Sequence, residues 1–461
     1  MPRRPLPSAR PALAVALLAA LVAGSTAGAQ DAAPATPLTL ERAIATALER
    51  NETPEIAVAR LERAQAIRDQ AIAALLPSLT LNGTYTRRAR EVTREISGDT
   101  VTVQAIDALN GQAVAESVLF DLRALPLLRA AKAGVAAQER ESSELNRALA
   151  FDVAQGFINA ISSERLLGAA QERVQVAAAT LRETRIRLEA GLANRNDVTR
   201  TELEHATAEV GATQAANLVS TTRLALSYLI GESIDGRELA VPEPPTLPAG
   251  GVEALLERAQ ASRLDLVALA ERARQLRQLA LVPRYGIAPR FDLRGLYRWT
   301  NEAGLSGSEE DWNVALNLTW ELFDGGDRYA VAAQRDAEAR EAELVLANAK
   351  REVELEVRRA LADLEATLAT VAQAEIRQEV SRANAEEVHE RFLNGLATAL
   401  EEADALASRF EADAQAVFQR NSRAAAQLDL LRALGDWPLP QPVQPAALGP
   451  PTAPAAPEES R

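Results

Sequence analysis

Large apolar side chains alternate with polar or small ones through Trp312-Asn-Val-Ala-Leu-Asn-Leu-Thr-Trp-Glu-Leu322. A period of two residues is typical of a β-strand with one apolar face. The preceding residues Phe291–Thr300 alternate in the same way, and the segment between them contains Gly304, Gly307 and several charges. The pattern predicts a hairpin with strands at 290–300 and 312–323, joined by a polar loop.

Aromatic residues gather on these strands. Seven of the seventeen aromatics lie between Tyr285 and Phe323, and three of the four tryptophans are among them. A strand of about 9–11 residues with one apolar face, one polar face and aromatic ends is typical of a transmembrane β-barrel. We therefore expect membrane-interface positions for Tyr297, Trp299, Trp312 and Trp320. The strands alone leave open a soluble hairpin that packs on helices.

The chain is a duplication. Gly191-Leu-Ala193 recurs as Gly395-Leu-Ala397, and Phe120-Asp121 recurs as Phe323-Asp324 in the same order. Self-similarity at a fixed offset indicates a repeated structural unit. We expect a first structural repeat at 30–240, a Pro-rich connector at 241–251 and a second structural repeat at 252–437.

Each repeat is expected to contain a helix, a strand pair, a very long helix and a shorter helix. Ala, Leu, Glu, Gln and Arg dominate the helical parts, and all are good helix formers. The very long helices, expected at 124–190 and 327–393, would be about 100 Å long at ~1.5 Å per residue. They must therefore lie side by side as coiled-coil-like rods. The expected ranges are strands 78–88 and 112–121, helices 124–190 and 197–230 in the first repeat, and helices 327–393 and 398–434 in the second.

The two ends of the chain differ from the repeats. Arg3, Arg4 and Arg10 precede an apolar run, and Ala27-Gly-Ala29 fits the small-residue cleavage rule, so residues 1–29 are interpreted as a signal peptide. An N-terminal membrane anchor is the alternative, but the run is shorter than the ~20 residues that span a bilayer. Residues 438–461 are rich in Pro and Ala without periodicity and are expected to form a disordered tail.

Composition excludes several classes of function. The chain has no Cys and only His205 and His389, which are expected to be solvated helix residues, so Cys-ligated metals and multi-His sites are excluded. The net charge of −14 argues against nucleic acid as a partner. No acid–base or metal constellation is apparent, and we expect no cofactor, no metal and no enzymatic activity.

Four strands are too few to close a barrel, because the smallest transmembrane barrels have about 8. Open strand edges do not occur in lipid, so several copies of the chain must share one barrel. Three copies supply a 12-stranded barrel with a pore, whereas the interior of an 8-stranded barrel is nearly filled by side chains. The strand count therefore predicts a homotrimer in contact with outer-membrane lipid.

The sequence resembles the TolC-like outer-membrane efflux protein family. The matching motifs span about residues 38–437 and are Leu38-Thr-Leu-Glu-Arg-Ala43, Leu76-Pro-Ser-Leu79, Leu322-Phe-Asp-Gly-Gly326 and Gly395-Leu-Ala-Thr398. The resemblance implies a trimeric α-barrel of long helices below a shared β-barrel, located in the cell outer membrane with a large periplasmic projection. It also implies a passive duct that works with a periplasmic adaptor (membrane fusion) protein and an inner-membrane transporter of the RND or ABC type, in efflux or type I secretion. A periplasmic coiled-coil adaptor or tether without a pore is the alternative function.

The resemblance assigns roles to residues near the two expected helical turns. Gly191, Leu192, Gly395, Leu396 and Thr398 would form the periplasmic tip where the adaptor docks. Glu401, Asp404 and Asp197 would narrow the pore and favour cations, as rings of carboxylates do. The alternative for these carboxylates is a purely structural role opposite the helix dipole. Arg200 stands where the second repeat has Asp404, so the first repeat departs from the acidic pattern.

Overall fold

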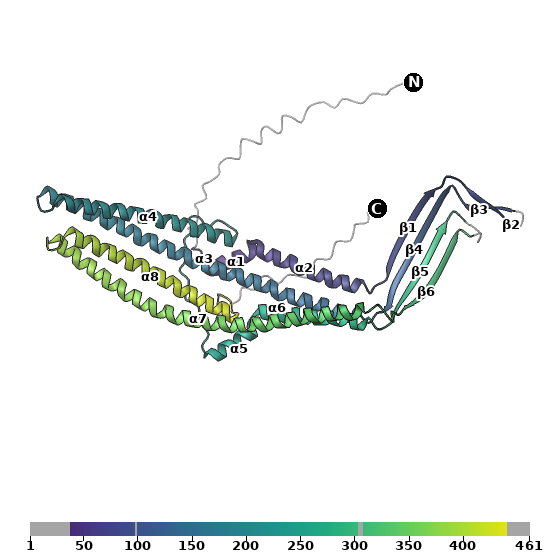
Figure 1. The fold of residues 1–461 in the computed structure, drawn as a ribbon. Helices are drawn as coiled ribbons and strands as arrows, with labels where there is room; N and C mark the ends of the chain where they lie inside the picture. Colours follow the sequence, from purple (N-terminus) through teal and green to yellow (C-terminus); the bar gives the residue numbers. More distant parts are fainter. Residues whose placement is uncertain (1–36, 97–98, 303–307, 440–461) are drawn as a thin grey trace, which may run out of the picture.

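The computed structural model describes residues 37–96, 99–302 and 308–439. Within these residues, long helices form a rod and a small sheet extends from one end of it (Figure 1). The architecture is therefore mainly α with a small β part, which confirms the predicted fold class. The expected signal peptide and residues 440–461 of the expected tail lie outside the described residues.

The two halves of the chain have the same order of helices, and corresponding helices have nearly equal lengths. The long helices α3 and α7 contain 66 and 67 residues, and α4 and α8 contain 36 each. The first half contains α1 (Leu40–Arg50), α2 (Glu52–Ala73), β1 (Ser78–Arg87), β2 (Val92–Ile96), β3 (Asp99–Gln104), β4 (Asp107–Phe120), α3 (Ala124–Glu189) and α4 (Arg195–Ile230). The second half contains α5 (Val252–Ser262), α6 (Leu264–Tyr285), β5 (Arg290–Thr300), β6 (Glu310–Thr319), α7 (Asp327–Leu393) and α8 (Ala399–Leu434).

Two features differ from the sequence expectation. A second hairpin, β2–β3, occupies part of the segment expected to be a loop, since its Val and Thr residues favour strands. The single helix expected before each strand pair is two helices, with breaks at Asn51 and Arg263. At the first break the Asn51 side chain caps α2 by accepting a hydrogen bond from Thr53 N (2.9 Å), and Pro54 lies in the first turn, where proline is tolerated.

The four main strands form one antiparallel sheet in the order β1-β4-β5-β6. The pairing of β4 with β5 joins the two halves of the chain. Because side chains alternate across a strand, the observed register gathers apolar residues on one face and polar residues on the other. The apolar face carries Leu79, Leu81, Tyr85, Ala113, Leu293, Tyr297, Trp312, Val314, Leu316 and Leu318. The polar face carries Thr80, Asn82, Thr84, Gln112, Glu116, Arg294, Arg298, Asp311, Asn313 and Asn317.

The helices continue the order of the strands. Next to the sheet, α2 packs on α3, α3 on α6 and α6 on α7. Toward the opposite end, α4 packs on α3, α3 on α8 and α8 on α7. The long helices α3 and α7 therefore run through both halves of the rod, while the shorter helices succeed one another along it (Figure 1).

The core is densest in the middle of the rod, where shorter helices meet end to end beside α3. Ile44, Phe157 and Ile230 are fully or almost fully buried there. The α4 and α8 helices end at this level with Gly231 and Gly435, whose φ angles are +79° and +80°. A Cβ atom on Gly231 would lie 2.9 Å from the Arg50 carbonyl oxygen, and one on Gly435 would lie 2.9 Å from Ser262 Oγ. Only glycine fits this conformation and this space.

Candidate functional site

Two helical hairpins, α3–α4 and α7–α8, end together at the end of the rod farthest from the sheet (Figure 1). The turns have the same geometry. Gly191 and Gly395 both have a φ of +74°, and the following amides, Leu192 N and Leu396 N, donate to the carbonyl oxygens of Arg187 (2.8 Å) and Arg391 (2.7 Å). These are Schellman C-caps, in which a glycine satisfies the last carbonyl groups of a helix.

Leucine side chains project from both turns. Leu192 is 80% exposed and Leu396 is 71% exposed. Thr398 follows as the N-cap of α8, and its Oγ1 accepts from Glu401 N at 3.2 Å. All five residues expected at the tip therefore lie in or beside the two turns. Each turn therefore exposes one leucine at this end of the rod.

Glu401 and Asp197 occupy equivalent positions in capping boxes. The Glu401 carboxylate accepts from Thr398 N (2.7 Å), and the Asp197 carboxylate accepts from Asn194 N (3.0 Å). Hydrogen bonds from Thr398, first from its backbone amide and then from its side chain, lower the pKa of Glu401 below its ordinary value. Both side chains therefore have the structural role that the sequence left open.

Glu401 and Asp404 share one face of α8, as their spacing predicts. Both line a groove against α7, together with Asn384, Val388 and Arg391. Asp197 belongs to the other hairpin, on α4, and does not line this groove. Within one chain the structure thus brings two of the three expected constriction residues together and leaves the third on the neighbouring hairpin.

One acidic residue beside them has a different environment that the sequence analysis did not single out. The Glu402 side chain is 1% exposed, and its Oε1 accepts a hydrogen bond from Thr180 Oγ1 (3.1 Å) and lies 2.7 Å from His389 Nδ1. Burial raises the pKa of Glu402, although contacts with His389, Thr180 and Arg187 oppose the rise. The expectation that His389 is simply solvated is therefore corrected, because its imidazole contacts a buried carboxyl group.

The sequence did contain a signal for this burial. Ala399, Glu402, Ala405 and Leu406 are all buried and recur at the spacing of an inward helix face. A charged residue in such a stripe is uncommon unless it has a partner.

Further contacts join the two hairpins near the tip. The Arg187 guanidinium donates to the Leu393 carbonyl oxygen (2.6 Å) and lies 4.5 Å from the centre of the Phe392 ring. Farther along, Arg409 of α8 pairs with Glu172 of α3 at 2.5 Å. Each contact links the first half of the chain to the second, so the tip ends of the hairpins are held together by polar interactions.

The four expected interface aromatics lie at two levels of the sheet. Tyr297 and Trp312 are directly paired on β5 and β6 near the end away from the helices, and Trp299 is nearby on β5. Trp320 follows β6 at the helical end, where its Nε1 donates to the Ile287 carbonyl oxygen at 3.0 Å. Trp312 is 72% exposed in the single chain.

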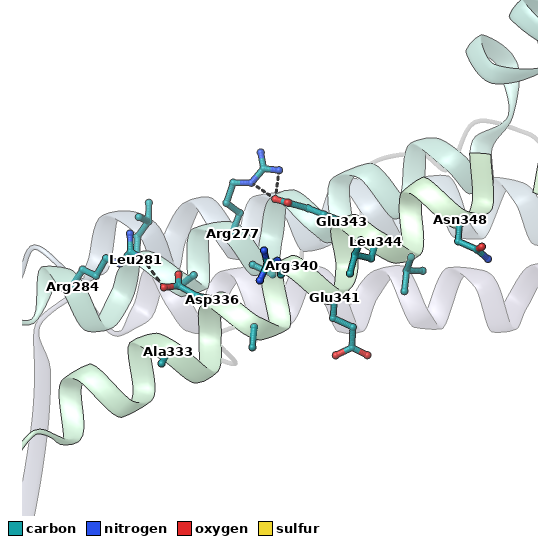
Figure 2. A pocket seen from close by; sticks show the side chains of 14 residues that line it. Arg277, Leu281, Arg284, Ala333, Asp336, Arg340, Glu341, Glu343, Leu344 and Asn348 are labelled. Carbon is teal, nitrogen blue, oxygen red and sulfur yellow. Dashed lines mark hydrogen bonds and ion pairs between the residues drawn. The ribbon is translucent and has the colours of Figure 1, made fainter. Parts of the chain in front are cut away.

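An open groove of about 1070 Å³ runs between α6 and α7 (Figure 2). Ion pairs bridge it, Arg277 to Glu343 at 2.5 Å and Arg284 to Asp336 at 2.6 Å. Leu344 on α7 lines the groove and is 64% exposed. The groove therefore has an exposed apolar residue on α7 and two ion pairs that join its two helices.

Across residues 37–96, 99–302 and 308–439, no three His, Asp or Glu side chains gather as a metal site would require. In the same residues, no helix combines the length and hydrophobicity needed to cross a bilayer.

Comparison with known proteins gives one family. The model of the family described as "Outer membrane efflux protein" matches residues 43–232 and 255–436. The two matched segments correspond to the two halves of the chain. No curated protein matches the sequence.

Solved structures with the same fold are outer-membrane channels. VceC from Vibrio cholerae has a TM-score of 0.73 at 20% identity, covering 87% of this chain and 97% of its own. CmeC from Campylobacter jejuni has a TM-score of 0.75 at 18% identity, covering 86% and 85%. MtrE from Neisseria gonorrhoeae, described in its open state, has a TM-score of 0.73 at 22% identity, covering 87% and 89%. At these identities the likeness shows the fold.

Proposed function

The chain belongs to the outer membrane efflux protein family, and on this premise we propose that three copies form the exit duct of a tripartite export system. In this proposal the duct is passive and spans from the periplasm to the exterior. A periplasmic adaptor docks at the helical tip, and an inner-membrane transporter of the RND or ABC type supplies the energy.

The proposal of a shared barrel rests on the two edge strands of the sheet. β1 and β6 are the end strands, and since each neighbouring pair is antiparallel, β6 runs antiparallel to β1. Pairing β6 of one chain with β1 of the next therefore continues the same pattern. Closure removes the open edges, which lipid does not tolerate.

The apolar face of the sheet has the dimensions of a membrane band. Leu81 is 75% exposed, Val314 64% and Leu316 63% in the single chain, so this face needs an apolar environment. Trp312 and Trp320 are eight residues apart, which is about 26 Å along a strand and close to the ~25 Å apolar band of outer-membrane barrels. We assign Tyr297, Trp299 and Trp312 to the outer interface and Trp320 to the periplasmic one.

The helices support the same assembly. In the order α2-α3-α6-α7, the end helices α2 and α7 continue the edge strands β1 and β6. Ile67 on α2 is 52% exposed and Leu344 on α7 is 64% exposed. We propose that α2 of one chain packs beside the groove between α6 and α7 (Figure 2) of its neighbour, and that Ile67 and Leu344 are buried in the trimer.

In this proposal, residues at the helical tip narrow the pore and bind the adaptor. Glu401 and Asp404 would form rings of carboxylates around a constriction, with Asp197 contributing from the neighbouring hairpin, and such rings attract cations. Leu192 and Leu396, held by the caps at Gly191, Gly395 and Thr398, would be the apolar docking surface for the adaptor.

Bilayer recording tests the proposed function. Full-length protein extracted in detergent is expected to migrate as a trimer in sedimentation and to conduct ions when added to a planar bilayer. A monomer without conductance would contradict the duct and favour a tether without a pore.

A further inference from the structure

A buried carboxyl group lies where the two hairpins meet near the tip. Glu402 on α8 contacts Thr180 on α3 and His389 on α7. The hydrogen bond from Thr180 crosses from the first hairpin to the second. Glu402 Oε2 is buried and has no hydrogen-bond partner among the described residues. This is an unusual site for a carboxylate, because a buried charge without full pairing destabilises the packing around it.

We propose that Glu402 and His389 form a proton-dependent latch that holds the α3–α4 and α7–α8 hairpins together near the tip. The Glu402 side chain is uncharged when its carboxyl group holds a proton. When that proton leaves, a carboxylate remains in the junction beside the imidazole. The negative charge is then buried with one oxygen unsatisfied, and the junction weakens.

Among the described residues, no charged group other than His389 is hydrogen-bonded or ion-paired to the Glu402 side chain. On α3, Arg187 bonds Glu183 (2.9 Å) and the Leu393 carbonyl oxygen. On α8, Glu401 is held in its capping box and Asp404 lines the groove with Arg391 of α7. His389 is therefore the titratable side chain in direct contact with the buried carboxyl group, and its own side chain is 44% exposed, so protons can reach the pair from solvent.

The direction of the pH effect follows from linkage. Burial raises the pKa of Glu402 in the packed junction relative to a solvated glutamate. When packing raises the pKa of a group, the group gives its full stabilisation of the packed state at any pH below its ordinary pKa. This stabilisation is lost as the pH rises through the raised pKa. The latch is thus closed at low pH and weakens toward alkaline pH.

The absence of cysteine from the chain allows a direct test of the latch. Ala405 is 5% exposed and lies one turn beyond Glu402, so an Ala405→Cys reporter becomes reactive to a small maleimide only when the junction opens. Labelling rates are compared at the same pH between this reporter alone and the reporter combined with Glu402→Gln. The ratio of the two rates cancels the pH dependence of the thiol itself. An Ala133→Cys reporter, also buried (6% exposed) but on α3 in the part of the rod that packs on α6, is the matched control.

The labelling rate of the reporter alone, divided by its rate when combined with Glu402→Gln, is expected to be near one at pH 4, below the ordinary pKa of a glutamate, and to rise toward pH 8.5. The rise is tenfold for each unit by which burial raises the pKa. The Ala133→Cys reporter is expected to give the same rate with and without Glu402→Gln. A ratio that does not change between the two pH values would overturn the proposal.

A second variant keeps the test decisive if Glu402→Gln disturbs folding. His389→Gln changes a half-exposed side chain and removes a contact that lowers the pKa of Glu402. In this variant the pH-dependent rise in labelling rate is expected to occur at higher pH. An unchanged midpoint of that rise would contradict the pairing of Glu402 with His389. The latch lies within one chain and goes beyond the proposed function as a duct. Cysteine labelling tests the latch and conductance tests the duct, so either proposal can be contradicted without the other.

Discussion

Replacing Gly435 by alanine should destabilise the protein much more than replacing Gly395, although both glycines end a helix in the left-handed conformation. Their φ angles are +80° and +74°. They differ in surroundings, since nothing lies within 4 Å of a Cβ on Gly395, whereas a Cβ on Gly435 would lie 2.9 Å from Ser262 Oγ and 3.0 Å from Arg263 N.

The two variants separate the energy of the left-handed backbone conformation from the energy of steric overlap. A left-handed conformation costs an L-residue about 1–2 kcal/mol, which both variants share. Gly435→Ala adds an overlap with the backbone amide of Arg263, which cannot rotate away. Overpacking of this kind costs about 1–3 kcal/mol. We therefore expect Gly435→Ala to lower the free energy of unfolding by roughly 2–5 kcal/mol and Gly395→Ala by ~1–2 kcal/mol.

Urea unfolding followed by far-UV circular dichroism measures the difference, because most of the signal comes from the helices. Gly231→Ala and Gly191→Ala provide an independent pair, since Gly231 is crowded by the Arg50 carbonyl and Gly191 is open. Equal losses for the crowded and the open glycine of either pair would refute the steric argument.

Three further substitutions test other parts of the account. Leu316→Arg on the apolar face of the sheet should oppose insertion into lipid by about 2–4 kcal/mol, whereas Asn317→Arg on the polar face should have little effect; equal partitioning of the two variants into vesicles would contradict the facial assignment. Glu401→Gln combined with Asp404→Asn should reduce cation preference in single-channel recordings while leaving the helix cap able to form; unchanged selectivity would leave these side chains with a structural role only. Arg147 is 2% exposed and bonds Glu144 and two carbonyl oxygens at the end of α8. Arg147→Met should therefore lower the free energy of unfolding by about 3–5 kcal/mol in urea titrations. A loss below ~1 kcal/mol would contradict its anchoring role.

The periodic parts of the fold were predictable from the sequence. The alternation at Trp312–Leu322 and the long apolar stripes report burial directly, and repeated motifs such as Gly191-Leu-Ala193 mark equivalent turns. The mainly helical fold with a small sheet followed from these patterns, whereas the family membership followed from the resemblance of the motifs, and both are confirmed.

Long-range pairing was not predictable in the same way. The Asn51 side chain, which caps α2, also donates a hydrogen bond to the Leu229 carbonyl oxygen, 178 residues away. The contact of Glu402 with Thr180 spans 222 residues, and no local pattern encodes it. The sequence therefore placed Glu401 and Asp404 on one face and Glu402 in an inward stripe, but it could not show that this stripe packs against Thr180 of α3.

Cross-linking of the sheet edges tests the central proposal of a shared barrel most directly. In the cysteine-free chain, Asn82→Cys on β1 is combined in turn with Asn313→Cys, Ala315→Cys or Asn317→Cys on the same face of β6. Oxidation is expected to give covalent dimers and trimers for at least one register, and none when Asn82→Cys is combined with Leu316→Cys on the opposite face. Only monomers in every combination would contradict closure of the barrel between neighbouring chains.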